Sequence, residues 1–545
     1  SNANVNPGGN TEETEGNGNP GAPDGGNPDV DSRPGDPNLW VFENVLGTPN
    51  VDDDDRNGTR DWFEAPFAAD DDVSKLVLSA EALATVPDGD TVTLNLSGDT
   101  AVISVHHNGR WIGADSGTTL LVTPQGPEEV IDVSFANFNA VGSLEINHVD
   151  AAGNVVKSAN VILRSSPMIM NHHLQTTEQV WAVAINGGDS YNNISMLNAY
   201  QAELGNRFTP ISGAAYQYDV WIQDEIEFAT SIGNNGQRLD TVIDSNRNRG
   251  LDPFAETLTA PGTISASWGP QTGATTFDSF GNLEASPPVT VNGVEYPFGR
   301  IYWGRRGNYG PNSALRTQLA NQDVQKPFEV DTSWLCVGHI DEITSFVPDP
   351  SSPKGFKFLM ADTVSAYQVI NSLPTGTSLP KYGEEYPYDS VGDIRYDSNL
   401  KALNQEIQQD YLDPILAKFK QELGLTEADI IRIPTIFETI SQCGAAALVP
   451  GMVNLIVANT PGQPIKIFMA DPFFRSNLSS QAGDPFIAAV NAVMPAGLEM
   501  HYVDNWYVYH RGIGEVHCGT NVRRTPSGQW WTDATHLLSR NTGGL

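Results

Sequence analysis

One stretch near the C-terminus reads Gly514-Glu515-Val516-His517-Cys518-Gly519-Thr520-Asn521-Val522-Arg523-Arg524, and it follows a β-rich run. It places a lone cysteine, Cys518, between His517 and Gly519. Two further segments carry groups that a catalytic thiol needs: Trp221-Ile222-Gln223-Asp224-Glu225-Ile226-Glu227 and Val337-Gly338-His339-Ile340-Asp341-Glu342. A thiol, an imidazole and two carboxylates are the groups required for covalent attack on a positively charged carbon. A serine or cysteine protease does not need two more carboxylates facing its substrate.

These groups fit the hydrolysis of a guanidinium, which is planar, cationic and a poor electrophile. Two carboxylates must hold its nitrogens, a thiolate must attack its central carbon, and an acid must protonate the departing nitrogen. We assign these tasks to Asp224 with Asp341, to Cys518 and to His339, respectively. His339 and Asp341 are two positions apart, so on a strand they would share one face. His517 would point away from Cys518 in an extended chain, and we do not assign it as the base.

Each of these features also has a non-catalytic explanation. An isolated cysteine is more often a small buried apolar residue than a nucleophile. A His-X-Asp pair is more often structural, and a Trp-X-X-Asp pattern indicates nothing by itself.

The composition narrows the class of protein. The chain has 545 residues, which predicts two or three domains, and 39% of them are hydrophobic, enough for packed cores. Its formal net charge of −36 argues against nucleic acid as a partner, because phosphate binding needs clustered Lys and Arg. A cationic substrate or metal ions suit this charge. Plain solubility of a secreted or surface protein explains it equally well.

The cysteines are few: Cys336, Cys443 and Cys518. An odd, sparse set excludes a scaffold built on disulfides, and if Cys518 is a nucleophile, only Cys336 and Cys443 can pair. The sequence contains no signal peptide and no apolar run long enough to span a bilayer. Because the opening Ser1-Asn2-Ala3 resembles an expression scar, we expect a secreted, periplasmic or cell-surface-anchored protein whose N-terminal segment is missing.

Three regions follow one another along the chain. Residues 1–39 are the scar and a Gly-, Asn-, Pro- and acid-rich tail, which we expect to be disordered. Residues 40–167 carry short alternating runs, such as 91–96, and a turn at 150–154, and they predict an all-β immunoglobulin-like sandwich. Residues 168–545 mix predicted strands and helices and hold the candidate catalytic groups. Their periodicity predicts a strand at 179–185 and helices at 194–204, 404–423 (with Pro414 as a kink or restart) and 486–493.

The chemistry-bearing segments resemble the active-site segments of protein-arginine deiminases, calcium-dependent enzymes that convert peptidyl arginine to citrulline. The resemblance extends over residues 168–545, and the disordered tail stands where the vertebrate members have a further N-terminal β domain. Other segments match in the same order, which makes the resemblance specific: Val242-Ile243, Asp244-Ser245-Asn246-Arg247-Asn248-Arg249-Gly250-Leu251, Asp278-Ser279-Phe280-Gly281-Asn282-Leu283-Glu284-Ala285-Ser286-Pro287-Pro288, Met452-Val453-Asn454 and Trp530-Trp531.

This resemblance implies that a five-fold pseudosymmetric α/β propeller, the fold of guanidine-modifying enzymes, follows the β-sandwich. It implies that Cys518 forms a covalent thiouronium intermediate while ammonia leaves. His339 would act first as the acid and then as the base for the hydrolytic water, and Asp224 and Asp341 would clamp the guanidinium.

The resemblance also implies how the rest of the substrate is bound. Trp221 would pack against the aliphatic stem of the substrate arginine. Arg249, assisted by Arg247, would donate hydrogen bonds to the peptide carbonyls of the substrate. An enzyme for free arginine would instead need a group for the α-carboxylate, and an arginine could serve there too.

Calcium is the implied cofactor, bound by oxygen ligands. The family pattern places one ion on Gln223, Glu227, Glu284 and the carbonyls of Phe280 and Leu283. It places a second ion on Glu225, Asp244, Ser245 and Asn248. Acids crowded beside Asp224 repel one another, so a bound cation would order this loop. The alternative for each acid is a solvated surface charge.

The β-rich region has an acidic cluster of its own. Its alternating oxygens resemble the calcium-binding segment of the family's middle domain, with the best matches at Asn50, Asp52, Asp54 and Asp72. A plain acidic loop is the alternative, because such loops are common on acidic proteins.

Our interpretation is a calcium-dependent hydrolase of peptidyl arginine, with arginine-containing proteins or peptides as partners. One alternative is a deiminase of free arginine or agmatine with the same chemistry. Another is a calcium-stabilised surface binding protein with a vestigial active site. A Cys-His protease leaves Asp224 and the calcium acids without a purpose.

Overall fold

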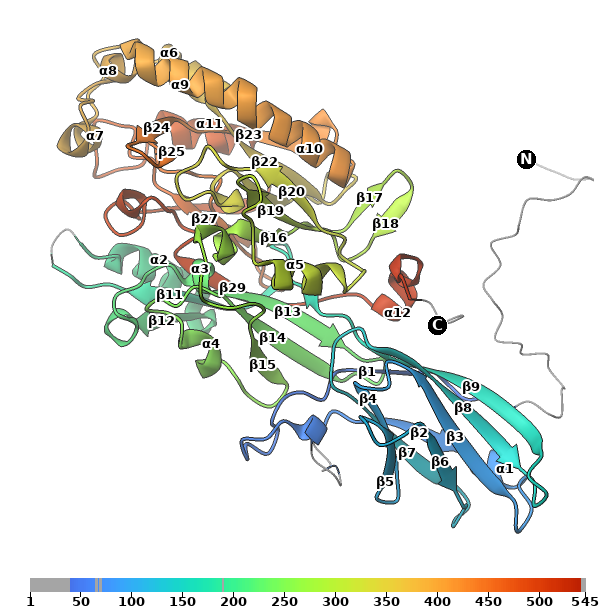
Figure 1. Cartoon of the computed structure of the whole chain (residues 1–545). Helices are drawn as coiled ribbons and strands as arrows, with labels where there is room; N and C mark the ends of the chain where they lie inside the picture. Colours follow the sequence, from blue (N-terminus) through green and yellow to red (C-terminus); the bar gives the residue numbers. More distant parts are fainter. Residues whose placement is uncertain (1–39, 64–66, 68–70, 189–190, 541–545) are drawn as a thin grey trace, which may run out of the picture.

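The structure is a computed structural model that describes residues 40–63, 67, 71–188 and 191–540 (Figure 1). The predicted tail at residues 1–39 lies outside the described residues. No helix in the described part of the chain combines the length and apolar character needed to cross a membrane.

Residues 45–165 form two β-sheets at one end of the molecule, coloured blue to cyan in Figure 1. The strand order of the larger sheet is β1 (Val45–Gly47), β9 (Val155–Ser165), β8 (Val141–Val149), β3 (Thr91–Gly98) and β6 (Thr119–Val122). That of the smaller sheet is β2 (Ser74–Leu78), β7 (Glu129–Phe135), β4 (Ile103–His107) and β5 (Arg110–Gly113). Strands β1 and β9 are parallel, and the other strand pairs in these two sheets are antiparallel.

Alternating apolar residues determine which face of each sheet is buried. In β3, Val92, Leu94 and Leu96 are buried and the residues between them are half-buried or exposed. The two sheets share one hydrophobic core. The predicted turn joins β8 to β9, and the Asp150 carboxylate accepts hydrogen bonds from the Asn154 backbone and side chain. Apart from a short helix, α1 (Ala80–Leu83), and a single 3-10 turn, the regular structure of this region is β as predicted, and the immunoglobulin-like topology stays a prediction.

The rest of the chain builds five sheets that share one pairing pattern. Each contains an antiparallel strand pair and a parallel one, joined through a common strand. Their strand orders are β12 (Phe208–Ser212), β11 (Thr176–Ala184), β29 (Thr520–Thr525); β10 (Ile169–Met170), β13 (Ile226–Ile232), β14 (Arg238–Asp244), β15 (Thr263–Ala266); β16 (Leu283–Ala285), β19 (Ile301–Arg305), β20 (Phe328–Asp331); β21 (Thr344–Pro348), β22 (Phe356–Asp362), β23 (Ile430–Pro434); and β26 (Ile456–Ala458), β27 (Ile465–Ala470), β28 (Leu498–Val503). Two hairpins, β17 (Val289–Val291) with β18 (Val294–Tyr296) and β24 (Phe437–Ile440) with β25 (Gly444–Ala447), accompany them.

The helices predicted from periodicity are present. Helix α2 (Ile194–Leu204) buries Met196, Tyr200 and Leu204, which recur at helical spacing. The predicted interruption at Pro414 is a π-helix, Ile407–Leu412, between α9 (Ser398–Glu406) and α10 (Asp413–Leu423), because proline lacks an N–H and its ring crowds the preceding turn. The remaining helices are α3 (Ile222–Glu225), α4 (Phe254–Thr257), α5 (Ser313–Ala320), α6 (Thr363–Ser372), α7 (Pro380–Glu385), α8 (Val391–Tyr396), α11 (Pro485–Val493) and α12 (Trp530–Asp533).

The two parts of the molecule pack against each other. Val51 and Phe138 of the β-rich part lie in one hydrophobic cluster with Leu239 and Ile243 of the α/β part. The buried Arg164 side chain donates to the Arg540 carbonyl at 2.9 Å, across the same junction.

The pairing of the last strand with an early one determines where Cys518 lies. Strand β29 runs antiparallel to β11, with Thr525 opposite Thr176 and Thr520 opposite Ala182. This pairing places β29, and with it the end of the segment that carries Cys518, next to helix α3 (Figure 1).

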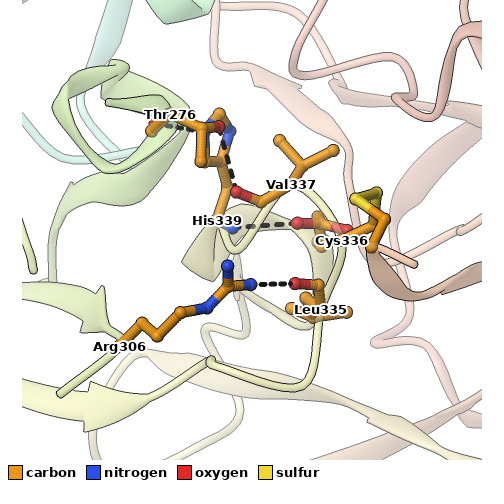
Figure 2. Close-up of a disulfide and its surroundings, with 8 residues drawn as sticks. Thr276, Arg306, Leu335, Cys336, Val337 and His339 are labelled. Atoms are coloured by element: carbon orange, nitrogen blue, oxygen red, sulfur yellow. Dashed lines mark hydrogen bonds between the residues drawn. A yellow bond between two sulfur atoms is a disulfide. The ribbon is translucent and has the colours of Figure 1, made fainter. Parts of the chain in front are cut away.

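Cys336 and Cys443 form a disulfide (Figure 2). The sequence allowed this pairing but did not require it. It joins the segment just before His339 to the turn between β24 and β25. The Cys336 N–H also donates to the Ala445 carbonyl at 2.8 Å. Among the described residues, Cys518 is the free cysteine.

Replacing Cys336 and Cys443 together by serine is expected to lower the free energy of unfolding by about 2–5 kcal/mol. The disulfide spans a sequence separation of 107, and closing a long loop restricts the unfolded chain. Thermal unfolding without reductant measures the effect, and reduction of the parent protein should reproduce it. Equal unfolding temperatures for the variant and its parent would contradict this expectation.

Candidate active site

Cys518 lies in a turn that ends where β29 begins. Its carbonyl accepts a hydrogen bond from the Gln223 N–H at 3.2 Å. Beyond it, the Asn521 side chain donates to Gln223 Oε1 at 2.9 Å and to the Ile226 carbonyl at 2.7 Å. The C-terminal segment and the α3 segment, 295 or more positions apart, are therefore tied together next to the thiol.

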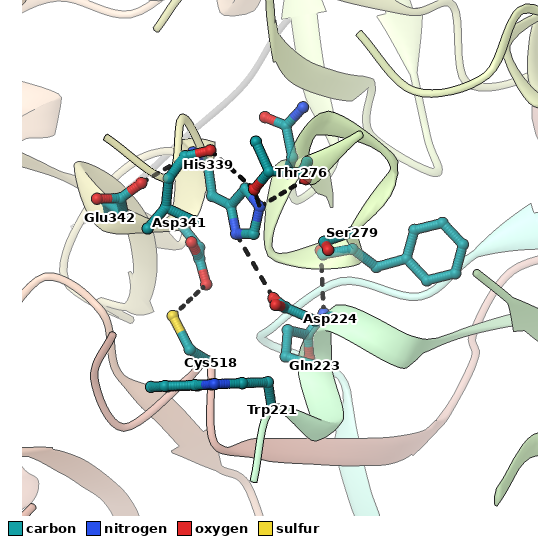
Figure 3. A network of polar contacts seen from close by, with 12 residues as sticks. Trp221, Gln223, Asp224, Thr276, Ser279, His339, Asp341, Glu342 and Cys518 are labelled. Atoms are coloured by element: carbon teal, nitrogen blue, oxygen red, sulfur yellow. Dashed lines mark hydrogen bonds and ion pairs between the residues drawn. The ribbon is translucent and has the colours of Figure 1, made fainter. Parts of the chain in front are cut away.

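The Cys518 thiol is buried between an acid and an amide. Its Sγ donates to Asp341 Oδ2 at 3.3 Å (Figure 3) and receives a hydrogen bond from Asn454 Nδ2 at 3.2 Å. Asn454 Oδ1 in turn accepts from the backbone N–H groups of His517 at 2.8 Å and Cys518 at 3.2 Å. Asn454 thus holds the cysteine at both its backbone and its sulfur. Sequence reasoning placed Asn454 in a matching segment without giving it a role, because nothing in its local sequence separates it from a structural asparagine.

His339 and Asp341 lie at a 3-10 helix, Ile340–Glu342, and not on a strand, so the alternation of a strand does not explain their shared direction. The tight turn nevertheless brings both side chains to the same site (Figure 3). His339 Nε2 is 2.8 Å from the Thr276 carbonyl, and Nδ1 is 3.5 Å from Asp224 Oδ1. Both ring nitrogens face oxygen acceptors, an arrangement that suits a protonated imidazole.

His517 also turns toward the site, so the prediction that it points away is wrong. Its Nδ1 is 2.9 Å from Asp341 Oδ2, the oxygen that the Cys518 thiol reaches. The alternation of side chains applies to extended backbone and not to this turn. Burial opposes a charge on the ring, but the carboxylates of Glu284 and Asp341 outweigh burial and raise the pKa of His517.

The surroundings of the thiol favour its neutral form. Burial raises the pKa of Cys518 well above its ordinary value, and the carboxylates of Asp341 and Asp224 raise it further. A cation placed between these two carboxylates would act in the opposite direction and favour the thiolate.

Trp221 forms one wall beside the thiol (Figure 3). Its indole lies so close to the backbone before Cys518 that a Cβ at Gly512 or Gly514 would come within 2.8 or 2.3 Å of the ring. Any larger residue at these two positions would displace the indole. A cavity next to the thiol is lined by residues that include Cys518, Asn454, Glu342, His510, Ile513 and Gly514.

Arg249 binds acids of its own chain in this structure. Its Nε and Nη2 pair with the Asp219 carboxylate, and its Nη1 donates to Asp224 Oδ2 at 3.0 Å. It therefore occupies one oxygen of the carboxylate predicted to clamp a guanidinium. Arg247 donates to Ser279 Oγ at 2.8 Å.

The first predicted calcium set is assembled by hydrogen bonds. Gln223 Nε2 donates to Glu227 Oε2 at 2.8 Å and to the Phe280 carbonyl at 3.3 Å. Leu283 and Glu284 begin β16 just beyond, and Glu284 Oε1 is buried without a hydrogen-bond partner. Burial raises the pKa of Glu227 to about 7 and that of Glu284 to about 8.

The second predicted set surrounds the start of β13. The Ser245 N–H donates to the Glu225 carbonyl at 2.9 Å. Both carboxylate oxygens of Glu225 and Oδ1 of Asp244 are buried without hydrogen-bond partners. Burial raises the pKa of Glu225 to about 9 and that of Asp244 to about 7. Asn248 instead donates its side-chain N–H to Gln271 Oε1 at 3.1 Å, so its amide is turned to that partner.

The acidic cluster of the β-rich part also comes together. Asn50 Oδ1 accepts from the Asp72 N–H at 2.9 Å. Carboxylate oxygens of Asp52, Asp54 and Asp61 lie within 4.8 Å of one another. Burial, followed by the charges of Asp52 and Asp54, raises the pKa of Asp72 to about 7. Asp61 was not among the predicted ligands.

The predicted ligands fit calcium in chemistry. They are carboxylates, amides and carbonyls, the oxygen donors that Ca²⁺ prefers. Buried carboxylate oxygens without partners, as in Glu225, Asp244 and Glu284, cost free energy that a cation would recover.

A buried thiol beside an imidazole, with two carboxylates facing the same space, supplies the groups that a cysteine hydrolase needs for a cationic substrate. Comparison with known proteins agrees: the profile of the protein-arginine deiminase (PAD) family matches residues 155–532. The chain belongs to this family.

Three human relatives illustrate the similarity. Protein-arginine deiminase type-4 is 34% identical over 403 residues, covering 72% of this chain and 59% of that protein. Type-3 is 33% identical over 408 residues (71% and 59%), and type-1 is 32% identical over 418 residues (73% and 60%). The chain thus spans 59–60% of the length of these relatives. An agmatine deiminase of C. jejuni matches in structure with a TM-score of 0.36 and 12% identity, covering 66% of this chain and 97% of that chain.

Proposed function

We propose that this chain catalyses the calcium-dependent hydrolysis of peptidyl arginine to peptidyl citrulline and ammonia. One observation carries the proposal: Cys518 Sγ lies 3.3 Å from Asp341 in a buried site where Asp224 faces His339. Two carboxylates beside a nucleophile suit a guanidinium and have no use in a protease. The family relatives, named protein-arginine deiminases, support the class of reaction.

In the first half-reaction, the guanidinium enters between Asp224 and Asp341, and its charge favours the Cys518 thiolate, so the thiol releases its proton to solvent. The sulfur forms a bond to the central carbon. The C–N bond to one terminal nitrogen then breaks, and the His339 imidazolium donates a proton to that nitrogen, which leaves as ammonia. The product is a thiouronium cation on Cys518, and the two carboxylates keep it in place.

In the second half-reaction, His339 is a neutral base and takes a proton from water. The resulting hydroxide attacks the thiouronium carbon, the C–S bond breaks with its electron pair returning to Cys518 as thiolate, and the proton left on the new carbonyl oxygen passes to solvent. Citrulline leaves, and the proton on His339 restores the imidazolium for the next cycle.

Substrate binding requires Arg249 to change partners. The substrate guanidinium must take the Asp224 oxygen that Arg249 now contacts, while Arg249 keeps its two-point contact with Asp219. A freed Nη1 can then donate to a peptide carbonyl of the substrate, assisted by Arg247. Trp221 packs on the aliphatic stem of the arginine.

Two of the proposed calcium ligands, Gln223 and Glu225, are the sequence neighbours of Asp224. Gln223, Glu227, Glu284 and the carbonyls of Phe280 and Leu283 would hold one ion, and Glu225, Asp244, Ser245 and Asn248 a second. Asn50, Asp52, Asp54 and Asp72 would hold another in the β-rich part. Bound calcium supplies the positive charge that lets these acids coexist beside Asp224 and orders the α3 segment.

The proposed architecture is an immunoglobulin-like sandwich at residues 40–167 and a five-bladed α/β propeller at 168–545. The five repeats of one strand-pairing pattern support the propeller. The disulfide supports a secreted, periplasmic or cell-surface location, because disulfides persist in oxidising compartments.

The test compares ammonia release from an end-blocked arginine peptide with release from free arginine and from agmatine, over a calcium titration with a chelator control. We expect kcat/KM for the peptide to exceed that for free arginine by about 10–100-fold. This factor corresponds to the free energy of a hydrogen bond from a charged arginine side chain to a peptide carbonyl of the substrate. Faster turnover of free arginine or agmatine would favour the small-molecule alternative.

A further inference from the structure

A second group of ligating side chains lies beside the candidate active site. His173, Glu284 and His517 are all buried, and one ligand atom from each lies within 4.8 Å of the others. His173 comes from the segment before β11, Glu284 from β16 and His517 from the turn before β29. Three distant parts of the chain therefore converge on one point.

The spacing of the ligand atoms suits a small tetrahedral metal ion. His173 Nε2 is 3.0 Å from Glu284 Oε2, and His517 Nε2 is 3.6 Å from Glu284 Oε1. Metal–ligand bonds of about 2.0–2.1 Å at tetrahedral angles place neighbouring ligand atoms roughly 3.3 Å apart. The two separations, each to a different oxygen of the Glu284 carboxylate, lie on either side of this value.

Both imidazoles are oriented as metal ligands usually are. His173 Nδ1 is 3.2 Å from Ser345 Oγ, and His517 Nδ1 is 2.9 Å from Asp341 Oδ2. A hydrogen bond at Nδ1 holds the ring and directs Nε2 toward the ion. Both Nε2 atoms here face the Glu284 carboxylate.

Two observations favour a cation beside Glu284. Glu284 Oε1 is buried and has no hydrogen-bond partner. Acidic side chains outnumber basic ones near the cluster: Glu227 and Asp341 lie close to it beside Glu284, and Arg524 is a nearby cation. A dication would satisfy the bare oxygen and balance this excess.

We propose that His173, Glu284 and His517 form a site for a zinc-type transition-metal dication, and that an ion there antagonises calcium. Two imidazoles and one carboxylate suit Zn²⁺, Ni²⁺ or Co²⁺, whereas Ca²⁺ takes six to eight oxygens. Glu284 also belongs to the proposed calcium set, so the two ions would compete for its carboxylate. An ion on His517 Nε2 would also keep the His517 Nδ1–H hydrogen-bonded to Asp341. The substrate guanidinium needs the same carboxylate. Only this antagonism, and not the binding of the ion, rests on the proposed function.

The binding test uses the full chain with Cys518→Ser, free of calcium, titrated with Co²⁺ and then with Zn²⁺. This variant removes the thiol as a competing ligand. We expect one Co²⁺ per chain with the intense visible bands of a four-coordinate ion, displaced by Zn²⁺. Adding His173→Ala removes a direct ligand and should weaken Co²⁺ binding by about 100-fold. This is the upper end of the loss in metal affinity that follows removal of a residue that only supports a ligand. Unchanged affinity in the His173→Ala protein, or binding that requires Cys518, would overturn the site.

His172→Ala is the matched control, because His172 is the adjacent buried histidine and uses its Nδ1 to accept the Leu174 N–H at 3.3 Å. It should leave Co²⁺ binding unchanged, and circular dichroism checks that all variants fold. If His172→Ala weakens binding as much as His173→Ala, the local fold and not the ligand is responsible, which also overturns the site.

The antagonism is tested with unmodified Cys518 by a calcium titration of peptide deimination at increasing Zn²⁺. We expect Zn²⁺ to raise the calcium concentration for half activity at least about tenfold, and His173→Ala to remove most of this shift. An equal shift in the parent and the His173→Ala protein overturns the antagonism. Intact cobalt bands without any deiminase activity would instead refute the proposed function and leave the metal site standing.

Discussion

Replacing Cys518 with alanine is expected to reduce kcat for arginine peptide hydrolysis by about 10⁴-fold or more, the size of loss that follows removal of a covalent nucleophile. No other described cysteine is free to substitute, because Cys336 and Cys443 are joined. A serine at position 518 should be nearly as inactive, since an alkoxide is far harder to form than a thiolate between two carboxylates. Ammonia release in saturating calcium measures both variants.

The folding of the Cys518→Ala protein is the control for this prediction. Its thermal unfolding should stay close to that of the parent, because the change removes only the sulfur and the two hydrogen bonds it makes. A saturating arginine peptide should also protect the parent from alkylation at Cys518. Residual activity above about one hundredth of the parent's would rule out the thiouronium mechanism, and a binding protein with a vestigial site would lose no function at all.

Removing calcium should have the second largest effect: activity falls to background, and thermal stability drops. Glu225 is the sharpest single test, since both of its carboxylate oxygens are buried without partners. With calcium at 100 times its dissociation constant, one site stabilises the fold by about 2.7 kcal/mol. Glu225→Gln keeps the shape but loses the charge, so we expect the calcium needed for half activity to rise about tenfold or more.

Glu128→Gln is the matched control for this variant, because Glu128 is exposed and lies outside the proposed ligand sets. It makes the same chemical change and should leave both the calcium titration and the unfolding temperature unaltered. Magnesium should not replace calcium, because it demands a tighter octahedral shell. Full activity in chelator, or a calcium titration of Glu225→Gln that matches that of the parent, would contradict this use of the second ligand set.

Local pattern predicted the regular elements well. Alternation in β3 and the i, i+4, i+8 apolar residues of α2 each follow from one repeated geometry, which a few neighbouring residues determine. The interruption before α10 was also predictable, because Pro414 acts on the turn that contains it.

The same local reasoning failed at the catalytic turns. His339 and Asp341 meet at a 3-10 helix and not on a strand, and His517 faces Asp341 because its backbone turns before β29 begins. Such irregular segments have no period, so their side-chain directions cannot be derived from spacing. Asn454 was missed as a positioning residue for a related reason: only its contact with Cys518 distinguishes it.

The sequence by itself determined which segments carry a thiol, an imidazole and acids. It also determined which runs become strands or helices, because these elements depend on residues that lie close together in the chain. Only the tertiary structure decided which of these groups meet. Pairing of β29 with β11 brings Cys518 to Gln223, and the Cys336–Cys443 disulfide anchors the segment that carries His339. Contacts across hundreds of residues depend on the packing of the whole chain, and so does the convergence of His173, Glu284 and His517.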